Sequence, residues 1–479
     1  MNTDHWILTG LLVAAEITAL LRAILRPHRE PSARIAWVVV IIVAPIVGIL
    51  AYLLLGETRI SSKRREIGRR IDHDLPRPPA HQQSMTAIAK GHYAAPFALA
   101  SSVNRLGTTG GNSARLAADS NVAIDEIVAD IDHARNSVHL CAYIWLDDTN
   151  GSKVKDALLR AVGRGVKVRA LADAFASRQF IGSDGWRALC SAGAEMRAAL
   201  PVGNLLWTAI RGRIDLRNHR KLTVIDNAIA WVGSQNVADP EFRIKPHYAP
   251  WVDIMTRWEG PVARHCQYLF VSDWMGEGGE DISGLLLEPP AVSVVDGQIM
   301  AQIIGTGPTG RFDAMPGCFS ELIHAARAEL VITTPYFVPD EQVMCALTSA
   351  ARRGVTTLLV LPQRNDSWVV AATSRSYYQD LLNAGVQLYE YRCGLLHAKT
   401  MVVDGEVGLI GSANLDRRSF ELNFENNILF SNRDFAAVLR ARQDEYLAQS
   451  DPLTQAGIAS ASVPRRLWQN SVAMVSPIL

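Results

Sequence analysis

A histidine, a lysine and an aspartate recur at one spacing in two distant parts of the chain. The first copy reads His219-Arg-Lys-Leu-Thr-Val-Ile-Asp226 and the second reads His397-Ala-Lys-Thr-Met-Val-Val-Asp404. Each is followed by a Gly-Ser pair that begins 14 residues after its histidine, and by an asparagine 17 residues after it. One match to H-x-K-x4-D is weak evidence, because its three residue types are common. Two copies with matching downstream spacing indicate an internal duplication.

Two imidazoles and two ammonium groups in one site suit the chemistry of a phosphodiester. One imidazole can attack phosphorus while the other protonates the leaving oxygen, and the lysines can hold the non-bridging oxygens. Because side chains supply the positive charge, we expect neither a metal nor another cofactor. The predicted catalytic residues are His219, Lys221, Asp226, His397, Lys399 and Asp404. The predicted substrate-binding or orienting residues after the two copies include Ser234, Asn236, Ser412 and Asn414.

Each copy has the pattern of a β-hairpin. An apolar, β-branched run follows each lysine, at residues 222–225 and 401–403, and predicts a strand. Positions i and i+2 of a strand share a face, so the histidine and lysine of a copy point the same way. Each copy closes on a tight-turn dipeptide, Asp-Asn or Asp-Gly, and a second apolar strand follows. The aspartate could therefore support the turn or act directly in the site.

At these residues the chain resembles the phospholipase D superfamily, whose members carry this duplicated motif. The resemblance spans roughly residues 115 to 479. The run from Gly411 to Glu425, together with the apolar N-terminus, looks like the bacterial cardiolipin synthases of that superfamily. In the superfamily an acidic residue downstream of each motif orients the histidine. By position, Asp253 is the candidate for the first copy and Glu425 for the second.

The remaining sequence predicts the scaffold that holds the two hairpins. From residue 122 onward, helical and strand patterns alternate, which indicates an α/β fold with a mostly parallel sheet. The same order recurs later in the chain, so that Arg164-Gly-Val matches Arg353-Gly-Val. We expect two similar phospholipase D-like lobes about a pseudo-two-fold axis, with His219 and His397 in one shared site at the seam.

The N-terminus predicts a transmembrane helical hairpin. Residues 35–55 contain 21 uncharged positions, enough to cross about 30 Å of hydrocarbon, with Pro45 tolerated as a kink. Residues 6–25 are a weaker span, because Glu16 lies near the middle. A cleaved signal peptide fits poorly, since no basic region precedes the apolar one. Three arginines lie between the spans and six arginines and lysines follow within residues 59–70, which places the catalytic part in the cytoplasm.

These patterns divide the chain into five expected parts. They are two transmembrane helices (1–58), a basic and proline-rich linker (59–115), a first phospholipase D-like lobe (116–272), an inter-lobe linker (273–296) and a second lobe with a C-terminal tail (297–479).

Composition narrows the function classes. The net charge of +1 gives no general nucleic-acid signature, and six scattered cysteines without a C-x-x-C pair argue against a zinc site or a disulfide framework. The sequence does not indicate an oligomeric state. A soluble phosphodiesterase is disfavoured by the apolar N-terminus, and a non-enzymatic scaffold by two intact motifs.

The resemblance implies an enzyme of the bacterial inner membrane, with several spans and a cytoplasmic catalytic domain. It implies phosphatidylglycerol as both donor and acceptor, giving cardiolipin and glycerol through a phosphohistidine intermediate. We assign His219 as the nucleophile and His397 as the acid and base, although the pseudo-symmetry permits the reverse. The residues leave the acceptor open: water would make the protein a membrane-anchored phospholipase D, and another alcohol would give a different phospholipid.

Overall fold

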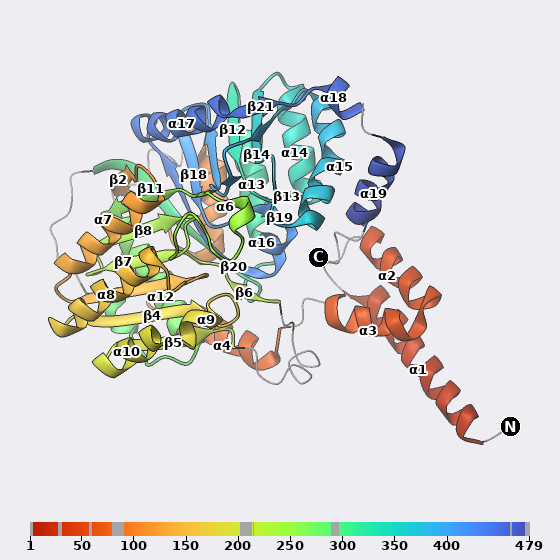
Figure 1. Ribbon diagram of the computed structural model, residues 1–479, viewed down its shortest axis with the longest axis horizontal. Helices are drawn as coiled ribbons and strands as arrows, with labels where there is room; N and C mark the ends of the chain where they lie inside the picture. The colour runs from red at the N-terminus through yellow and green to blue at the C-terminus, as the bar shows by residue number, and fades with distance from the viewer. Residues whose placement is uncertain are drawn as a thin grey trace.

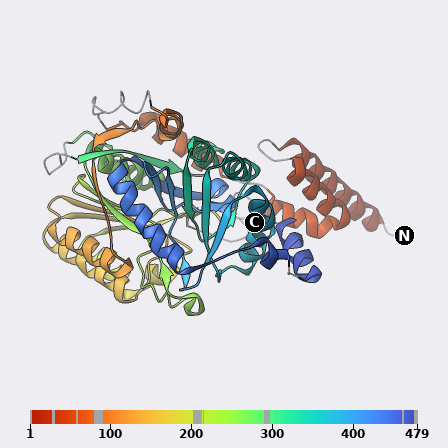
Figure 2. The same ribbon diagram turned by 90° about the horizontal axis from the view of Figure 1, so that it is seen from above.

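The structure is a computed structural model. It describes residues 3–26, 31–56, 60–78, 91–201, 213, 215–288, 297–459 and 462–474. Two α/β lobes lie side by side, and the N-terminal helices project from one side of them (Figures 1 and 2).

The first lobe is built on a seven-stranded sheet in the order β2-β10-β8-β7-β3-β4-β5. Its strands are β2 (Ser113–Leu116), β3 (Ser137–Ala142), β4 (Lys167–Asp173), β5 (Glu195–Ala199), β7 (Leu222–Ile225), β8 (Ile229–Gly233) and β10 (Met255–Glu259). Its helices are α7 (Ser120–His133), α8 (Thr149–Gly163), α9 (Arg178–Ile181), α10 (Asp184–Ala192) and α12 (Pro261–Gly276), with short 3-10 turns η1 (Pro246–Tyr248) and η2 (Ser283–Leu286).

The second lobe is built on a ten-stranded sheet in the order β1-β11-β20-β18-β17-β12-β14-β15-β21, with β6 also paired to β20. Its strands are β1 (Thr109–Gly111), β6 (Arg217–Asn218), β11 (Gly297–Thr306), β12 (Glu329–Thr333), β14 (Thr356–Pro362), β15 (Gln387–Tyr391), β17 (Thr400–Val403), β18 (Val407–Gly411), β20 (Asn423–Ser431) and β21 (Ser450–Pro452). Its helices are α13 (Ala314–Ala325), α14 (Glu341–Arg352), α15 (Trp368–Ala384), α16 (Arg417–Glu421), α17 (Arg433–Ala448), α18 (Gln455–Ala459) and α19 (Val463–Met474).

The predicted duplication is confirmed in the sheets. The prediction of a mostly parallel sheet was wrong, because both sheets are mixed and most of their neighbouring strands are antiparallel, the motif hairpins among them. The parallel strands are β3, β4 and β5 of the first lobe, which correspond to β12, β14 and β15 of the second. In each lobe the motif strand, β7 or β17, lies antiparallel to the first strand of that set and turns back as β8 or β18. Both motifs therefore sit in the middle of their sheets, where neighbouring strands fix them on both sides.

A shared core joins the lobes. Helix α12 is buried along its length from Pro261 to Val271. It packs on strands of both sheets, and at its contact with β11 a Cβ on Gly305 would lie 2.4 Å from Leu269. Trp258 of the first lobe lies 5.9 Å from Phe430 of the second, centroid to centroid. Each such large apolar side chain stabilises the contact by about 1.5–3 kcal/mol, so the lobes hold one fixed relative position.

The segment expected to be a linker before the first lobe is largely folded. It contains α4 (Ser62–Asp74), α6 (Ala94–Asn104) and the strands β1 and β2. Phe97 of α6 is buried in the core of the second lobe, while β1 pairs with β11 of that lobe and β2 with β10 of the first. Basic and proline-rich composition concealed these elements, because their apolar contacts are with residues distant in sequence.

The N-terminal helices differ from the prediction in one respect. Helix α1 (Thr3–Leu25) is continuous, and within the described ranges it is the helix long and apolar enough to cross a membrane. The second predicted span is instead two short helices, α2 (Pro31–Val43) and α3 (Pro45–Leu55), which meet at Ala44. Pro45 has no N–H and its ring crowds the preceding turn, so one straight helix through this point is disfavoured.

Candidate active site

Two short pairs of strands bring the motifs together across the seam. Strand β6, just before His219, pairs in parallel with the start of β20 in the second lobe. The reciprocal pair joins β16 (Leu395–Leu396), just before His397, to β9 (Trp251–Val252) of the first lobe. A third short pair, β13 (Phe337–Val338) with β19 (Leu415–Asp416), lies within the second lobe. The strand that leads into each histidine is thus paired with a strand of the opposite lobe.

The orienting acids are consequently exchanged between the lobes. His219 Nδ1 lies 2.9 Å from Glu425 Oε2, and His397 Nδ1 lies 2.6 Å from Asp253 Oδ1. The prediction that each acid orients the histidine of its own half was wrong in its pairing, although it selected the right two acids. The strand pairs explain the exchange. The backbone N–H of His219 donates to the backbone oxygen of Phe424, which precedes Glu425, and the backbone N–H of His397 donates to that of Val252, which precedes Asp253.

The two lysines lie beside their own histidines. Lys221 Nζ donates to the backbone oxygen of His219 at 2.8 Å, and Lys399 Nζ donates to that of His397 at 2.6 Å. Both side chains are buried. A lysine ammonium has three N–H donors, so each keeps further donors for an anion between the histidines.

The serines of the Gly-Ser pairs hold the acids. Ser234 Oγ donates to Asp253 Oδ1 at 2.6 Å, and Ser412 Oγ donates to Glu425 Oε2. Glu425 also accepts from Ser419 Oγ at 2.8 Å and from Asn423 Nδ2 at 3.1 Å. The serines therefore fix the position of the orienting acids, and Glu425 has the denser set of donors.

A cavity of about 370 Å³ opens in front of both histidines. Asn236 and Asn414 line it, and the buried Oδ1 atom of each has no hydrogen-bond partner among the described residues. Buried amide oxygens are costly to leave without a partner, so both atoms are suited to accept hydrogen bonds from a substrate. Of the predicted residues, His219, His397, Asn236 and Asn414 line the cavity directly.

Asp226 and Asp404 lie away from the cavity. Asp226 accepts hydrogen bonds from the backbone N–H groups of residues 135, 136 and 137, and Asp404 accepts from those of residues 327, 328 and 329. Both have φ of +52°, as the hairpin turn requires. A four-residue strand, about 13 Å long, separates each from its lysine. They tie the hairpin to the start of a neighbouring strand, which favours the structural of their two predicted roles.

Burial shifts the ionisation of every central group. It lowers the pKa of His219 well below its usual value, and repulsion from Lys221 and Lys399 lowers it further. It raises the pKa of Glu425 to about 7 and lowers those of Lys221 and Lys399 to about 7 and 8. These shifts follow from the cost of burying a charge.

The second histidine–acid pair behaves differently. Burial alone would raise the pKa of Asp253, but attraction to His397 and the hydrogen bonds from His397 and Ser234 outweigh it and lower that pKa. Burial lowers the pKa of His397, and Asp253 opposes the change. The pKa of His397 is therefore lowered overall, but Asp253 offsets part of the effect of burial, whereas at His219 repulsion from the two lysines adds to it.

Several other residues line the cavity, and among them Asp366 and Lys245 were not selected from the sequence. Asp366 accepts a hydrogen bond from Tyr336 at 2.6 Å and pairs with Lys245 at 2.7 Å. Arg418 donates to the backbone oxygen of Asp215 at 2.9 Å. Asp366 follows the carboxyl end of the parallel strand β14, where α/β proteins place ligand-binding residues. This position after a predicted parallel strand was the sequence signal that could have identified Asp366 as a site residue.

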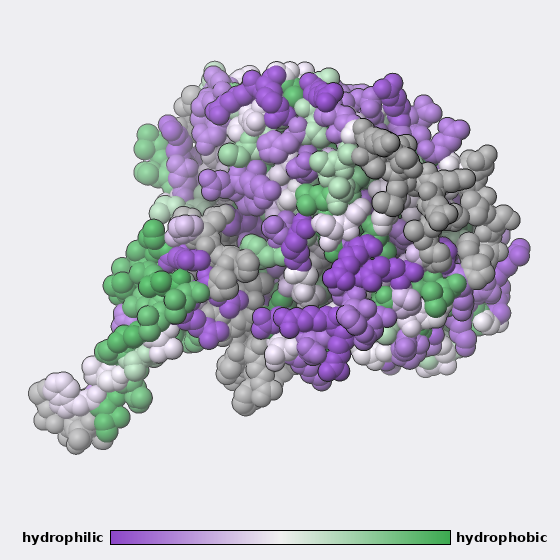
Figure 3. All heavy atoms as spheres, turned by 180° about the vertical axis from the view of Figure 1, so that it is seen from behind, coloured by the Kyte–Doolittle hydropathy of each residue, from purple (hydrophilic) through white to green (hydrophobic). Residues whose placement is uncertain are grey.

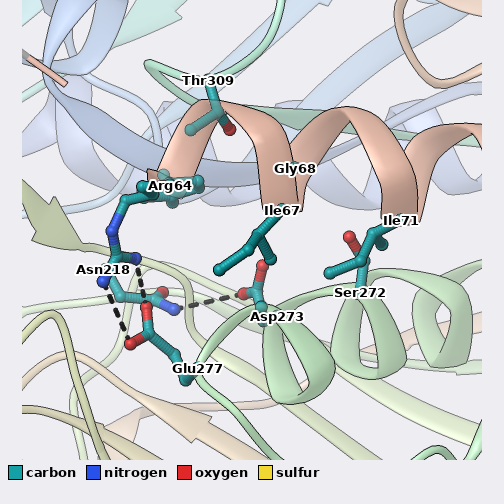
Figure 4. A pocket seen from close by; sticks show the side chains of 11 residues that line it. Arg64, Ile67, Gly68, Ile71, Asn218, Ser272, Asp273, Glu277 and Thr309 are labelled. Carbon is teal, nitrogen blue, oxygen red and sulfur yellow. Dashed lines mark hydrogen bonds and ion pairs between the residues drawn. The ribbon is translucent and has the colours of Figure 1, made fainter. Parts of the chain in front are cut away.

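A second, smaller cavity of about 60 Å³ is lined by Asn218, which immediately precedes His219 in the chain (Figure 4). Its wall includes Asp273, which holds Asn218 at 3.1 Å and Arg220 at 2.5 Å on either side of His219. Arg64 of α4 pairs at 2.5 Å with Glu277, the residue that follows α12, and both side chains line the cavity. The chain leaving the N-terminal helices is thus fastened to the back of the first motif.

Comparisons with known proteins agree with these features. The family model described as "Cardiolipin synthase, PLD-like domain" matches residues 127–256 and 319–446, and the model "Phospholipase_D-nuclease N-terminal" matches residues 17–57. The proteins named cardiolipin synthase A of Salmonella typhimurium and Salmonella newport are each 37% identical to the chain over 467 residues, which cover 94% of this chain and 92% of theirs.

The solved structures add a likeness of fold. The crystal structure of phosphatidylserine synthase from Haemophilus influenzae superposes with a TM-score of 0.58 at 12% identity, covering 87% of this chain and 100% of that one. At this identity the likeness concerns the two-lobed architecture alone.

Proposed function

The chain belongs to the cardiolipin synthase family with phospholipase D-like domains, and from this premise we propose that it condenses two phosphatidylglycerol molecules into cardiolipin and glycerol. It is a phosphatidyltransferase. The observation that carries the proposal is the pair of exchanged histidine–acid contacts facing one cavity. One imidazole can form a bond to phosphorus there while the other transfers a proton.

In the first half-reaction His219 attacks the donor phosphate. Its Nδ1–H is held by Glu425, which leaves Nε2 with a free electron pair. The new N–P bond forms as the P–O bond to glycerol breaks, and His397 gives its Nε2 proton to the departing glycerol oxygen. The product is a phosphatidyl-His219 intermediate, free glycerol and a neutral His397.

In the second half-reaction His397 acts as a base. It takes the proton of the primary hydroxyl of a second phosphatidylglycerol, and that oxygen attacks the phosphorus. The N–P bond breaks, cardiolipin leaves, and both histidines return to their starting forms. Lys221, Lys399, Asn236 and Asn414 are proposed to hold the non-bridging oxygens in both steps, where one such donor contributes about 10²- to 10³-fold in rate.

The unequal environments support this assignment of roles. A nucleophile must be neutral, and burial with two nearby lysines lowers the pKa of His219 well below its usual value. A general acid must hold a proton, and the contact with Asp253 offsets part of the lowering that burial causes in the pKa of His397. The duplication alone would allow the opposite assignment.

The lining of the cavity favours a lipid acceptor over water. Arg178 and Arg418 place positive charge around it, whereas Lys245 is paired with Asp366. Phe175 and Ile244 provide exposed apolar surface. A second phosphatidylglycerol has a phosphate that would bind the cationic side chains and acyl chains that would contact the apolar surface. The alternative, hydrolysis or transfer to a small alcohol, needs neither.

We also place the enzyme at the bacterial inner membrane, with the catalytic lobes on the cytoplasmic side. Six arginines and lysines within residues 59–70 support this orientation. The apolar α1 supports an anchor in the bilayer. The arrangement with several spans, expected from the sequence, requires that the bent α2–α3 segment cross the bilayer.

The test uses detergent-solubilised protein and phosphatidylglycerol labelled in its terminal glycerol, with products separated by mass. Cardiolipin and labelled glycerol should appear in equal amounts, and a metal chelator should leave the rate unchanged because His and Lys supply the charge. Phosphatidic acid as the main product would replace the proposal with a phospholipase D. Replacing either His219 or His397 by alanine should abolish both products without loss of membrane insertion.

A further inference from the structure

Helices α2 and α3 fold against each other. Trp37 and Tyr52 are 15 positions apart, about 22 Å along a straight helix, yet their ring centroids are 5.4 Å apart. Gly48 of α3 packs so closely on α2 that a Cβ there would lie 2.5 Å from the backbone oxygen of Val40. The chain therefore reverses at Ala44, and both ends of the pair face the same way.

Two backbone hydrogen bonds hold the bend. Ala44 N–H donates to Val40 O at 3.1 Å, and Gly48 N–H donates to Ala44 O at 2.6 Å. Pro45 has no N–H to satisfy. Irregular backbone is tolerated at membrane depth only where such groups are paired or shielded by protein, and the contacts of α1 with both α2 and α3 add shielding.

Length separates α1 from the other two helices. At 1.5 Å per residue, the 23 residues of α1 span about 35 Å, while the 13 of α2 and the 11 of α3 span about 20 and 16 Å. The hydrocarbon core is about 30 Å thick. Helix α1 can cross it; α2 and α3 can each enter it but not cross.

The apolar side chains of the pair face outward. More than half of the side-chain surface is exposed on Ile35, Val39, Ile42, Val43, Ile46, Val47 and Leu50. Together with α1 they form a hydrophobic projection beside the catalytic lobes (Figure 3). Exposed apolar surface of this extent suits hydrocarbon rather than water.

The charges between the helices decide which side each end occupies. Residues 1–5 contain no arginine or lysine, residues 26–34 contain three arginines, and residues 59–70 contain six arginines and lysines. If residues 35–55 crossed the bilayer, the counts would be six on one side and three on the other. If α2 and α3 turn back, all nine arginines and lysines lie on one side of the membrane and none lies on the other. This distribution follows the positive-inside rule better.

We propose that α2 and α3 form a re-entrant hairpin in the cytoplasmic leaflet, that α1 is the single span of the N-terminal segment, and that the N-terminus lies on the far side of the membrane. This inference rests on the proposed membrane location. The hairpin stays in the leaflet that faces the catalytic lobes. Ile60, five residues after the end of α3, packs with Leu216 and Leu422, which directly precede the paired strands β6 and β20. The hairpin is therefore held near the strands that lead to His219 and Glu425.

Cysteine labelling of the full chain in membrane vesicles tests the orientation. The exposed Cys345 and Cys393 are replaced by serine, and the exposed Cys190 is kept as the marker of the catalytic side. Single cysteines are then introduced as Asn2→Cys or His28→Cys. An impermeant maleimide is applied to right-side-out and inverted vesicles, and cardiolipin formation by the same vesicles reports separately on the proposed function.

We expect the cysteine at position 28 to label from the same side as Cys190, and the cysteine at position 2 to label from the opposite side. Labelling of position 2 with Cys190 and of position 28 from the opposite side would overturn the inference in favour of two spans. Labelling of all three from one side would overturn it in favour of no span. Each of these readings is independent of catalytic activity.

A second pair of variants tests the bend. Gly48→Leu places a side chain against the backbone of α2, whereas Gly10→Leu on α1 meets nothing within 4 Å. We expect the first to change the labelling side of position 28 in a substantial fraction of molecules, or to lower the amount of inserted protein several-fold. The second should do neither. Equal, wild-type behaviour of both variants would contradict the folded hairpin.

Discussion

Glu425 of the second lobe holds Nδ1 of His219 in the first lobe, at 2.9 Å. In the reciprocal contact, Asp253 of the first lobe holds Nδ1 of His397 in the second lobe. Neither lobe contains a complete histidine–acid pair of its own. The catalytic unit is therefore the two-lobed body, and the buried core around α12 that fixes the lobes is as necessary to the site as the motifs are.

The two acids should differ in their effect on the pH profile. Because burial raises the pKa of Glu425 to about 7, its carboxylate is lost as pH falls below 7, and kcat/KM should fall with it. Glu425→Gln should lower kcat/KM by about 10²- to 10⁴-fold, as for a triad acid, and remove the loss between pH 8 and 6.

Asp253→Asn is the matched control for that experiment. The pKa of Asp253 is below its usual value, so its charge does not change in this range. The variant should be slow but keep the fall in activity below pH 7. An unchanged profile in the Glu425→Gln variant, or loss of the acidic limb in both variants, would contradict the assignment of that limb to Glu425.

Replacing Asp226 should affect folding more than chemistry. Its carboxylate accepts three backbone N–H groups at the start of β3, and a buried donor left unpaired costs about 1–3 kcal/mol. Asp226→Ala should lower the Tm markedly, while the folded fraction keeps the wild-type pH profile and product ratio. Asp226→Asn tolerates the positive φ and should be milder. Abolished turnover in stable protein would restore a direct catalytic role.

Arg178 should influence the choice of acceptor. It lines the cavity and stacks on Phe175, with 5.0 Å between the guanidinium carbon and the ring centroid. If it attracts the phosphate of the second lipid, Arg178→Gln should lower the ratio of cardiolipin to phosphatidic acid several-fold. Arg187→Gln is the control, because Arg187 is exposed, pairs with Asp184 and does not line the cavity. Equal ratios in both variants would remove Arg178 from acceptor binding.

The sequence was sufficient for the duplicated α/β fold, because the repeated motif and the alternating patterns are local signals. His219 and His397 could be placed in one site because a duplication implies two related lobes. The pairing of acids could not be predicted. It depends on the short contacts of β6 with β20 and of β9 with β16, each two residues long, which carry no pattern of their own.

At the N-terminus the local pattern was strong, but it did not determine the structure. Hydropathy over residues 35–55 measures only how apolar the segment is, and it cannot distinguish one long helix from two short ones. The reversal at Ala44 depends on Pro45 and on the close contact of Gly48 with Val40. The three arginines within residues 26–34 bear on the membrane topology, but the side to which they are assigned depends on whether residues 35–55 cross the bilayer or turn back.

The most direct test of the shared site uses a donor lipid whose leaving group needs no proton, phosphatidyl-p-nitrophenol. With this donor, His397→Ala should still release one equivalent of nitrophenolate per site and accumulate a phosphatidyl group on His219, found by mass spectrometry after rapid quenching. His219→Ala should give neither. Accumulation on His397 in the His219→Ala protein, with no burst from His397→Ala, would show that the two roles are reversed. No covalent adduct in either protein would contradict the phosphohistidine route itself.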